Sequence, residues 1–462
     1  MNPKLALILI AVLIVLRAVV AGLLPLSGDE AYYLLWSHHL AAGYYDHPPV
    51  IAFLIRTGVF LFGENPFGVR AAGILLSLFT TWFVWQTASL ILKAENKAAL
   101  AALLFNLTLM ANVEMLVATP DLPSITTVAA FIWCLAKAQA TRNGHWWLLA
   151  GLAAGLSLLS KYSALFVGLG ALAWLLADPR ARVWLKTIWP WAGGAVAVLV
   201  FTPHLLWQAQ NDWMTFAFQF GRVGGGNPTV RYVIEFVGAQ LGLATPLILV
   251  LGAIGFWQAR RPGHDRFLLF VMIAVALVYF LQHALRDRVQ GNWPAFLYPA
   301  LAILAADAAS RSKAWLARGA APLAALMLAI TYAHVLFGIL PLKNDPAARL
   351  LMKNFPAAAQ SLAERTEVAV TSDYETTALL RYYQPQLTVI QINDPQRYPW
   401  APAPDATMLK RQMVYFTAKR RNQVDLIRPY VRFLSDPLPY GDGSYEGRLI
   451  YRPLPSFAGK VP

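Results

Sequence analysis

The chain has 462 residues, of which 58% are hydrophobic and only 13% are charged. An ordinary soluble domain carries roughly 25% charged residues, so this composition is typical of a membrane protein and excludes a single soluble core. The net charge of +14 does not indicate a nucleic-acid partner, because the basic residues fall mostly in short loops between apolar runs, as the positive-inside rule predicts.

Apolar runs of about 20 residues, the length that a helix needs to cross a bilayer, recur from Leu5 to near Leu340. The first run contains Arg17 and is followed by many more, so it predicts a retained helix and not a cleaved signal peptide. The eleven predicted spans are residues 5–24, 66–92, 98–118, 122–135, 146–159, 162–176, 188–206, 236–257, 267–285, 293–309 and 320–340. Clusters of Lys and Arg mark the loops expected in the cytoplasm, which places the N-terminus inside and the C-terminus outside.

Residues 27–65, between the first two predicted spans, are too polar to span the membrane and too long to form a turn. They include an aromatic stretch at residues 31–40 and the run Tyr45-Asp46-His47-Pro48-Pro49. Because Tyr and Trp prefer the membrane interface, we expect this outward loop to hold interfacial helices.

After Pro341 the long apolar runs give way to proline, charge and short alternating stretches. Residues 374–383 predict a helix capped by Ser372 or Asp373. The predicted strands are residues 367–371, 387–392, 413–417 and 448–451. We therefore predict a transmembrane domain over residues 1–341 and a small periplasmic α/β domain over residues 342–462.

Two acidic sites lie in loops expected on the outer face. Asp29 and Glu30 stand at the exit of the first predicted helix, and Asp121 lies in a short loop fixed by two prolines. Carboxylates near a membrane are costly to desolvate, so these positions favour a functional role. The alternative is structural: Asp29 and Glu30 would cap a helix opened by Ser27, and Asp121 would cap the fourth span.

Basic residues on the outward side are few, which distinguishes them from the cytoplasmic clusters. They are Lys161, Arg222, Arg286 and Arg288. A phosphate at the membrane surface would need such cations, although long basic side chains also reach lipid headgroups for purely structural reasons. The histidines form no pair at metal-binding helical spacing, so no cofactor is firmly implied; a divalent cation between the first-loop acids and a phosphate stays open.

Six short motifs carry a resemblance to a known family. They are Asp29-Glu30-x-Tyr32, Tyr45-Asp46-His47-Pro48-Pro49, Thr119-Pro120-Asp121-x-Pro123, Ser160-Lys161-Tyr162, Trp207-x-x-Gln210-Asn211-Asp212-Trp213 and Asn292-Trp293-Pro294-Ala295. In this order and loop placement they resemble the bacterial protein-mannosyltransferase-like family, which are GT-C glycosyltransferases related to the lipid A aminoarabinose transferases. The resemblance covers residues 5–340 and implies an all-α polytopic membrane fold of the GT-C type.

The resemblance also implies an activity: inverting transfer of a sugar from a polyprenyl phosphate, such as undecaprenyl phosphate, on the outer face of the bacterial inner membrane. It carries the catalytic role over to Asp29, with Glu30 beside it. A carboxylate there would accept the proton of the acceptor hydroxyl as that hydroxyl attacks the anomeric carbon. Fixed cations would stabilise the negative charge on the departing phosphate.

The residues expected to bind substrate and phosphate are Tyr45, His47, Asp121, Lys161, Arg222, Arg286 and Arg288. His47 departs from the pattern, because the aminoarabinose branch places at the matching position a lysine that faces the donor phosphate. A histidine is only partly charged at neutral pH, so Lys161 or the arginines would carry more of the phosphate binding. Asp121 would orient the sugar or support the base.

The expected acceptor is lipid A, lipopolysaccharide, another envelope glycan or a protein, with membrane lipids around the bundle and no nucleic acid. Two alternatives are a flippase or transporter of lipid-linked sugar and a non-catalytic assembly subunit. Transport needs polar groups near the bilayer midplane, whereas charges inside the predicted spans are scarce and Arg17 is the main one. A non-catalytic subunit would not need the first-loop acids, so the sequence favours an enzyme.

Overall fold

The computed structural model describes residues 1–221, 227–343, 345–401 and 410–453. The chain divides into two compact units. The first unit consists of residues 1–23 and 41–339, and the second consists of residues 24–40 and 340–462.

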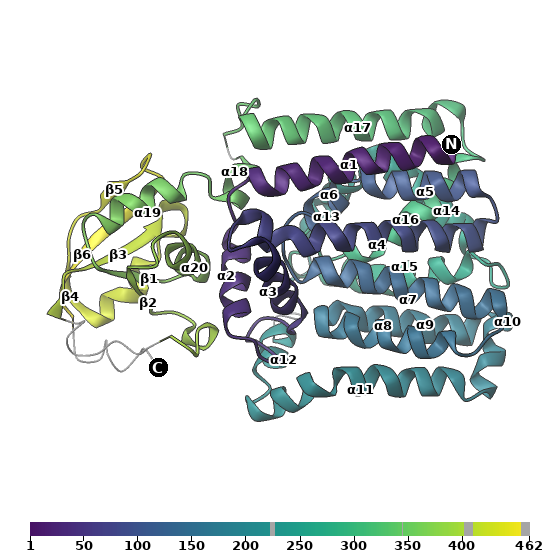
Figure 1. Ribbon diagram of the computed structural model, residues 1–462, viewed down its shortest axis with the longest axis horizontal. Helices are drawn as coiled ribbons and strands as arrows, with labels where there is room; N and C mark the ends of the chain where they lie inside the picture. Colours follow the sequence, from purple (N-terminus) through teal and green to yellow (C-terminus); the bar gives the residue numbers. More distant parts are fainter. Residues whose placement is uncertain (222–226, 344, 402–409, 454–462) are drawn as a thin grey trace. The chain divides into compact units, whose positions relative to one another are not determined.

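The first unit is a bundle of helices, and its long helices run side by side (Figure 1). Its α-helices are α1 (Pro3–Leu23), α3 (Val50–Phe62), α4 (Pro66–Leu92), α5 (Glu95–Leu107), α6 (Leu109–Glu114), α7 (Asp121–Thr141), α8 (Trp146–Ser160), α9 (Leu165–Ala177), α10 (Pro179–Arg182), α11 (Trp189–Gln210), α12 (Met214–Phe220), α13 (Arg231–Ala244), α14 (Pro246–Ala259), α15 (Phe267–Ala284), α16 (Tyr298–Ala309) and α17 (Ala314–Phe337). Short 3-10 helices include η1 (Tyr162–Ala164) and η3 (Ala295–Leu297).

The surface of the bundle is that of a multi-pass membrane protein. Among the described residues, 5 helices are long and apolar enough to cross a membrane, or up to 7 spans if each of two bent helix pairs counts as one. Helix α1 illustrates this apolar surface, because it exposes Leu7, Ile8 and Val12 while it buries Ile10 and Ile14. Hydrocarbon is a favourable solvent for such an apolar stripe, whereas water is not. The prediction of a helical membrane fold is confirmed, and the number of eleven spans stays a prediction.

Two of the predicted spans are interrupted, so the prediction of continuous helices is wrong there. Residues 236–257 are divided between α13 and α14, which are bent by 107°. Thr245 has a positive φ of 67°, and Pro246, which begins α14, has no amide hydrogen with which to continue the helical ladder. Residues 98–118 are divided between α5 and α6, where the Thr108 side chain caps the second helix.

Close packing of α8 on α11 depends on glycine. A Cβ atom added to Gly151 would lie 2.1 Å from the carbonyl oxygen of Gly193, so the two backbones touch directly. Small residues at helix crossings are the usual means of packing helices in a membrane, where apolar burial supplies little driving force. This contact fixes α8 on α11, and the candidate-site residue Lys161 directly follows the end of α8.

Inside the bundle, a buried arginine joins three helices. Arg17 of α1 is fully buried, and its Nη2 donates a hydrogen bond of 3.1 Å to Asn112 Oδ1 on α6. Tyr332 of α17 donates to the same oxygen at 3.0 Å. An intramembrane cation is costly, so its hydrogen-bonded partners specify how these helices meet.

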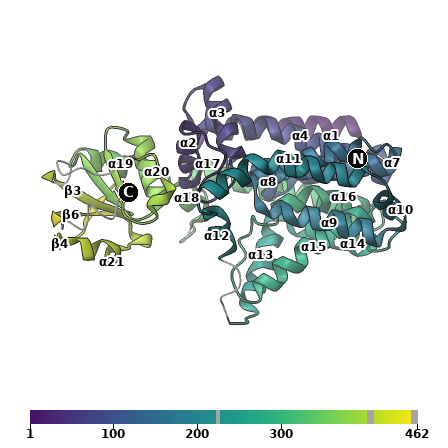
Figure 2. The same cartoon turned by 90° about the horizontal axis from the view of Figure 1, so that it is seen from below.

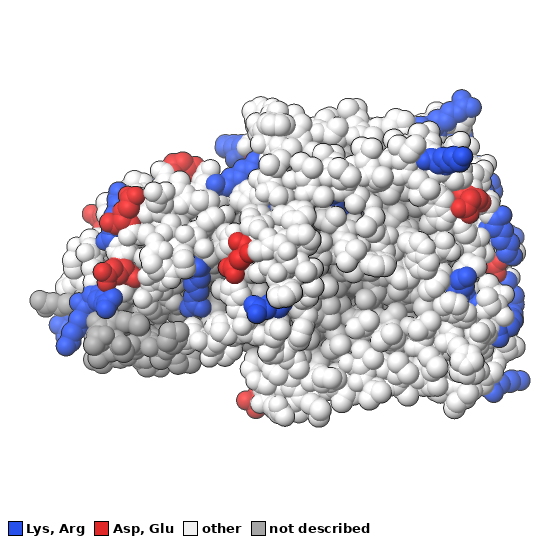
Figure 3. Space-filling model, in the orientation of Figure 1, with Lys and Arg blue, Asp and Glu red and all other residues white. Residues whose placement is uncertain are grey.

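Basic side chains gather at the end of the bundle that carries the N-terminus, on the face that Figure 3 draws, while the flank of the bundle there is nearly uncharged. Asp307 at the end of α16 accepts hydrogen bonds from Lys97, Arg266 and Arg311. We call this region the basic end of the first unit.

The second unit contains a mixed sheet with α-helices beside it. The strands are β1 (Val368–Thr371), β2 (Thr388–Gln391), β3 (Met413–Ala418), β4 (Val431–Leu434), β5 (Leu438–Tyr440) and β6 (Tyr445–Pro453), and the helices include α2 (Gly28–His38), α18 (Pro346–Leu351), α19 (Phe355–Ala363), α20 (Tyr374–Tyr383) and α21 (Val424–Ile427). The order is β2-β1-β3-β6-β4, with β5 also paired to β6. β1 pairs in parallel with β2 and β3, and the other pairs are antiparallel. Figure 2 shows α19 and α20 next to each other beside the sheet.

The predicted C-terminal elements are present. All four predicted strands correspond to β1, β2, β3 and β6, and α20 begins and ends at the predicted residues. Asp373 caps α20, because its Oδ1 accepts a hydrogen bond of 2.9 Å from the Thr376 amide. The short strands β4 and β5 were not predicted.

The assignment of residues 24–40 differs from the expected domain division, which placed residues 1–341 in one domain. It belongs to the second unit because α2 packs against α20. Aromatic side chains make this contact: the Tyr32 ring lies 5.0 Å from the ring of Tyr374 and 5.5 Å from that of Tyr398. The first predicted loop is therefore divided between the two units.

Candidate active site

The structure assigns the predicted site residues to different units. Asp29 and Glu30 belong to the second unit. Tyr45, His47, Asp121, Lys161, Arg286 and Arg288 belong to the first. Arg222 lies outside the described residues. Each group is described within its own unit.

Glu30 has a structural task at the start of α2. Ser27 is the N-cap residue, and its side chain accepts a hydrogen bond of 3.2 Å from the Glu30 amide. Glu30 Oε2 in turn accepts a hydrogen bond of 2.9 Å from the Ser27 amide. This reciprocal arrangement is a capping box, and Glu30 is fully buried. The structural alternative considered for the acidic pair therefore applies to Glu30.

Asp29 has a different environment from its neighbour. It is half-buried, and its Oδ1 accepts a hydrogen bond of 2.7 Å from the hydroxyl of Tyr374. Burial, followed by the negative charge of Asp29, raises the pKa of Tyr374 well above its ordinary value, so the phenol stays protonated and remains a donor. Sequence reasoning did not identify Tyr374, because only the fold brings together residues that are 345 positions apart.

A second carboxylate lies beside Asp29. Burial raises the pKa of Glu375, and the charge of Asp29 raises it further. Arg421 opposes these effects through an ion pair of 2.7 Å with Glu375 Oε1. The α2 N-terminus can approach this side chain because residue 28 is glycine: a Cβ atom added to Gly28 would lie 2.5 Å from the Cβ of Glu375.

In the first unit, Asp121 forms a buried ion pair with Lys161. The Lys161 ammonium lies 2.7 Å from each carboxylate oxygen, and the Asn292 side-chain amide donates to Oδ2 at 2.9 Å. These groups come from the start of α7, the end of α8 and the segment before η3. The expected helix cap is not observed, since the N-cap residue of α7 is Pro120 and no side chain caps it. The sequence motifs named all three residues but did not pair them.

The loop that carries Tyr45 and His47 is held by hydrogen bonds to its backbone. Thr215 Oγ1 donates to the Tyr44 carbonyl at 2.6 Å, and the Gln219 side-chain amide donates to the Asp46 carbonyl at 2.5 Å. The Tyr45 ring lies 4.8 Å from the Phe218 ring, so α12 contacts the loop at three of its residues. His47 is half-buried on this supported loop.

The supporting residues Thr215 and Gln219 were missed in the sequence. Both lie on α12 at a spacing of four, which places them on one face of a helix. That spacing was the available signal. Alone it does not show that the face contacts a loop some 170 residues earlier in the chain.

Arg286 and Arg288 are exposed in the segment after α15. Arg288 forms an ion pair of 3.1 Å with Glu235, and Arg231 contacts the same carboxylate at 2.9 Å. Such exposed ion pairs contribute little to stability, and an arginine in one of them can exchange its carboxylate partner for another anion. The observed pairs therefore do not exclude the predicted phosphate role.

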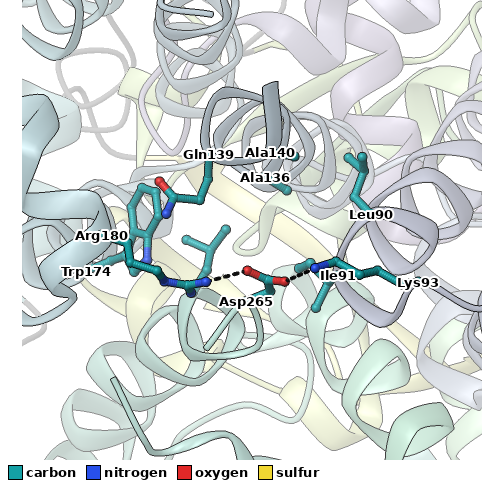
Figure 4. A pocket seen from close by; sticks show the side chains of 10 residues that line it. Leu90, Ile91, Lys93, Ala136, Gln139, Ala140, Trp174, Arg180 and Asp265 are labelled. Atoms are coloured by element: carbon teal, nitrogen blue, oxygen red, sulfur yellow. Dashed lines mark hydrogen bonds and ion pairs between the residues drawn. The ribbon is translucent and has the colours of Figure 1, made fainter. Parts of the chain in front are cut away.

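A pocket, drawn in Figure 4, lies at the other end of the bundle from Asp121. It has a volume of about 240 Å³, and Asp265 bridges Lys93 at 3.1 Å and Arg180 at 2.8 Å within it. Its lining includes Gln139 and Ala140 near the end of α7, whereas Asp121 begins that helix. At 1.5 Å per residue the separation along α7 is roughly 27 Å, so this pocket is not part of the candidate site.

Among the residues that the structure describes, no group of three or more His, Cys, Asp or Glu side chains is arranged to hold a metal ion. Around the two predicted acidic sites, the structure places Asp29 near Glu375, which pairs with Arg421, and it pairs Asp121 with Lys161. Chemically, the first group offers a carboxylate that can accept a proton, and the second offers a neutral pair with polar hydrogen-bonding partners.

Comparison with known proteins gives related sequences. Residues 46–207 match the family described as dolichyl-phosphate-mannose-protein mannosyltransferase. The chain is 28% identical to the lipid A galacturonosyltransferase RgtD of Rhizobium johnstonii over 350 residues, which covers 74% of this chain and 71% of that protein. It is 27% identical over 290 residues to an undecaprenyl phosphate-alpha-4-amino-4-deoxy-L-arabinose arabinosyl transferase of Pseudomonas fluorescens, covering 58% of this chain and 50% of the relative.

The fold matches a solved structure along nearly its whole length. The crystal structure of ArnT from Cupriavidus metallidurans bound to undecaprenyl phosphate superposes with a TM-score of 0.69 at 16% sequence identity. The match covers 97% of this chain and 98% of that protein. This likeness establishes the GT-C fold that the sequence motifs predicted.

Proposed function

We propose that this chain, a membrane glycosyltransferase of the protein-mannosyltransferase-like type, transfers a sugar from undecaprenyl phosphate to lipid A or another part of lipopolysaccharide. The names of its sequence relatives support the donor and the acceptor class, since they include a lipid A galacturonosyltransferase and undecaprenyl-phosphate aminoarabinose transferases. The carrying observation is the half-buried Asp29 carboxylate, held by a phenol donor at the start of α2.

We assign the general-base role to Asp29. The acceptor hydroxyl attacks the anomeric carbon, and its proton passes to the Asp29 carboxylate as the new carbon–oxygen bond forms. The bond from the anomeric carbon to the phosphate oxygen breaks, and its electron pair stays on undecaprenyl phosphate. A single displacement of this kind inverts the anomeric carbon.

Phosphate recognition is assigned to His47, Arg222, Arg286 and Arg288, with Tyr45 beside His47 on the same supported loop. Lys161 contributes less charge than the sequence suggested, because its ammonium is neutralised by Asp121. We assign Asp121 and Lys161 to orientation of the sugar through their remaining hydrogen-bonding capacity.

The location that fits this chemistry is the bacterial inner membrane. The positive-inside rule places the basic end of the first unit in the cytoplasm. The other end of the first unit, where Asp121 begins α7, would then face the periplasm, where lipopolysaccharide acceptors are exposed. For the second unit with Asp29, the periplasmic location is the one that the sequence predicts for the C-terminal domain.

The test is reconstitution of the purified chain in liposomes with lipid A and undecaprenyl phosphate that carries aminoarabinose, galacturonic acid or mannose. Mass spectrometry of lipid A measures transfer. We expect a mass increase for at least one donor, and we expect Asp29→Asn to lower kcat by roughly 100-fold to 10,000-fold, the usual contribution of a positioned base.

Asp425→Asn is the matched control, because Asp425 is an exposed aspartate of the second unit whose side chain is 90% accessible. Undiminished transfer by Asp29→Asn would refute the assignment of the base. If the unaltered protein consumes no donor but moves it between leaflets, the chain is a flippase and the proposed activity is wrong.

A further inference from the structure

The first residue of α20 is held in place from several directions. The hydrogen bond that the Thr376 amide donates to Asp373 caps the helix and fixes its start. The Tyr398 hydroxyl donates a hydrogen bond of 2.8 Å to the Tyr374 carbonyl. The guanidinium of Arg397 lies 4.5 Å from the centre of the Tyr374 ring. These contacts leave the phenol little freedom, so its hydroxyl is preorganised toward Asp29.

Asp29 is held from its own side as well. The capping box of Ser27 and Glu30 fixes the first turn of α2. The Tyr32 ring, one turn further along α2, packs 5.0 Å from the Tyr374 ring. Both partners of the 2.7 Å hydrogen bond are therefore fixed by their surroundings, as a rigid pair and not as two mobile surface groups.

We propose that Tyr374 is a positioning residue for the base Asp29, so that the second unit tunes the base of the transfer reaction. This inference rests on the proposed function. Tyr374 fixes the orientation in which the Asp29 carboxylate receives the acceptor proton. Glu375, held by Arg421, places a second acidic group next to the base.

The two residues of α20 act on Asp29 differently. A hydrogen bond donated to a carboxylate favours its ionised form, so Tyr374 lowers the proton affinity of Asp29. The raised pKa of Glu375 keeps that side chain protonated, and therefore uncharged, in the pH range where Asp29 takes up its proton, so Glu375 leaves this affinity nearly unchanged. The elements of the second unit that pack around Asp29 also carry these titratable or charged groups: Glu30, Tyr32, Tyr33, His38, Asp373, Arg381, Tyr382, Tyr383, Arg397, Tyr398 and Arg421.

The experiment compares Tyr374→Phe, Glu375→Gln and the unaltered protein by the pH dependence of kcat/KM in the reconstituted transfer assay. Activity falls on the acid side as Asp29 becomes protonated. We expect the acid limb of Tyr374→Phe to move to higher pH and that of Glu375→Gln to stay in place, because a protonated Glu375 is as uncharged as Gln in that pH range. Tyr374→Phe should also lower kcat roughly 10-fold with little change in KM, since a misplaced base affects the chemical step.

Tyr451→Phe is the matched control, because Tyr451 is an exposed tyrosine on β6 of the same unit. Its profile should match that of the unaltered protein. A thermal melt of each variant separates loss of fold from loss of positioning, and only variants that melt as the unaltered protein does are compared.

An unchanged acid limb in folded Tyr374→Phe, or a shift of that limb to lower pH, would overturn the inference. The activity of the Asp29→Asn variant distinguishes failure of this inference from failure of the proposed function. If Asp29→Asn is inactive and Tyr374→Phe is normal, Asp29 remains the base and only the inference fails. If Asp29→Asn is fully active, the base itself was misassigned. In the residual activity of Asp29→Asn, adding Tyr374→Phe should have no further effect on the pH profile.

Discussion

The sites around Asp121 and Asp29 contain the same functional group in opposite electrostatic settings. Asp121 faces the Lys161 ammonium with both oxygens, and Asn292 adds a third hydrogen bond. Asp29 receives a hydrogen bond from a neutral phenol and lies beside another carboxyl group. Asp121 is therefore part of a neutral ion pair, whereas Asp29 stands beside a second acid. The comparison separates an acid to which we assign an orienting role from one to which we assign the role of base.

The largest effect on stability is expected from Lys161→Met, which leaves Asp121 buried without its cation. Removing one partner of a buried ion pair lowers the free energy of unfolding by about 3–5 kcal/mol. Thermal unfolding in detergent measures the loss. The double variant Lys161→Met/Asp121→Asn should recover much of it, since no uncompensated charge remains. A single variant as stable as the unaltered protein would show that Asp121 is not neutralised by Lys161.

Gly28→Ala probes the contact between α2 and α20 on the Asp29 side. The new Cβ atom would lie 2.5 Å from the Cβ of Glu375, so one of the helices must move. Overpacking of this kind costs about 1–3 kcal/mol, and the displaced Asp29 should also lose transfer activity. Gly168→Ala on α9 is the control, because no described atom lies within 4 Å of its added Cβ. Equal stability and activity of both variants would contradict the direct contact.

The smallest expected effect is the pH dependence contributed by Glu375. Burial and the charge of Asp29 raise its folded-state pKa above the ordinary value of 4.5. The folded state therefore binds this proton more tightly than the unfolded state does. The resulting stability is fully present below pH 4.5 and is lost as the pH rises through the raised folded-state value.

Melting temperatures of the unaltered protein and Glu375→Gln, measured across that pH range, test this sign. The unaltered protein should lose melting temperature relative to the variant as the pH rises. Parallel curves would mean that Glu375 titrates in the folded state as it does in the unfolded chain, and would remove the electrostatic contrast between the two acidic sites.

Much of the fold follows from local sequence patterns. Long apolar runs predict membrane helices because hydrocarbon requires about 20 apolar residues with internally satisfied backbone groups. The switch to alternating stretches after Pro341 predicts the strands, and the Asp373 cap predicts the start of α20. The break at Thr245 and Pro246 was missed, because the proline lies inside an otherwise continuous apolar run and many membrane helices tolerate proline.

For the candidate site, the sequence by itself determined the residues to which we assign the chemistry: the acids Asp29 and Asp121, the cation Lys161 and the His47 loop. Only the tertiary structure decided which partner each acid has, because Lys161 and Asp121 are 40 residues apart and Tyr374 and Asp29 are 345 apart. Motifs record residue types along the chain, whereas proton affinity depends on the charges and donors that folding places within a few ångströms. For that reason Asp121 is part of a neutral ion pair, whereas Asp29 is the candidate base.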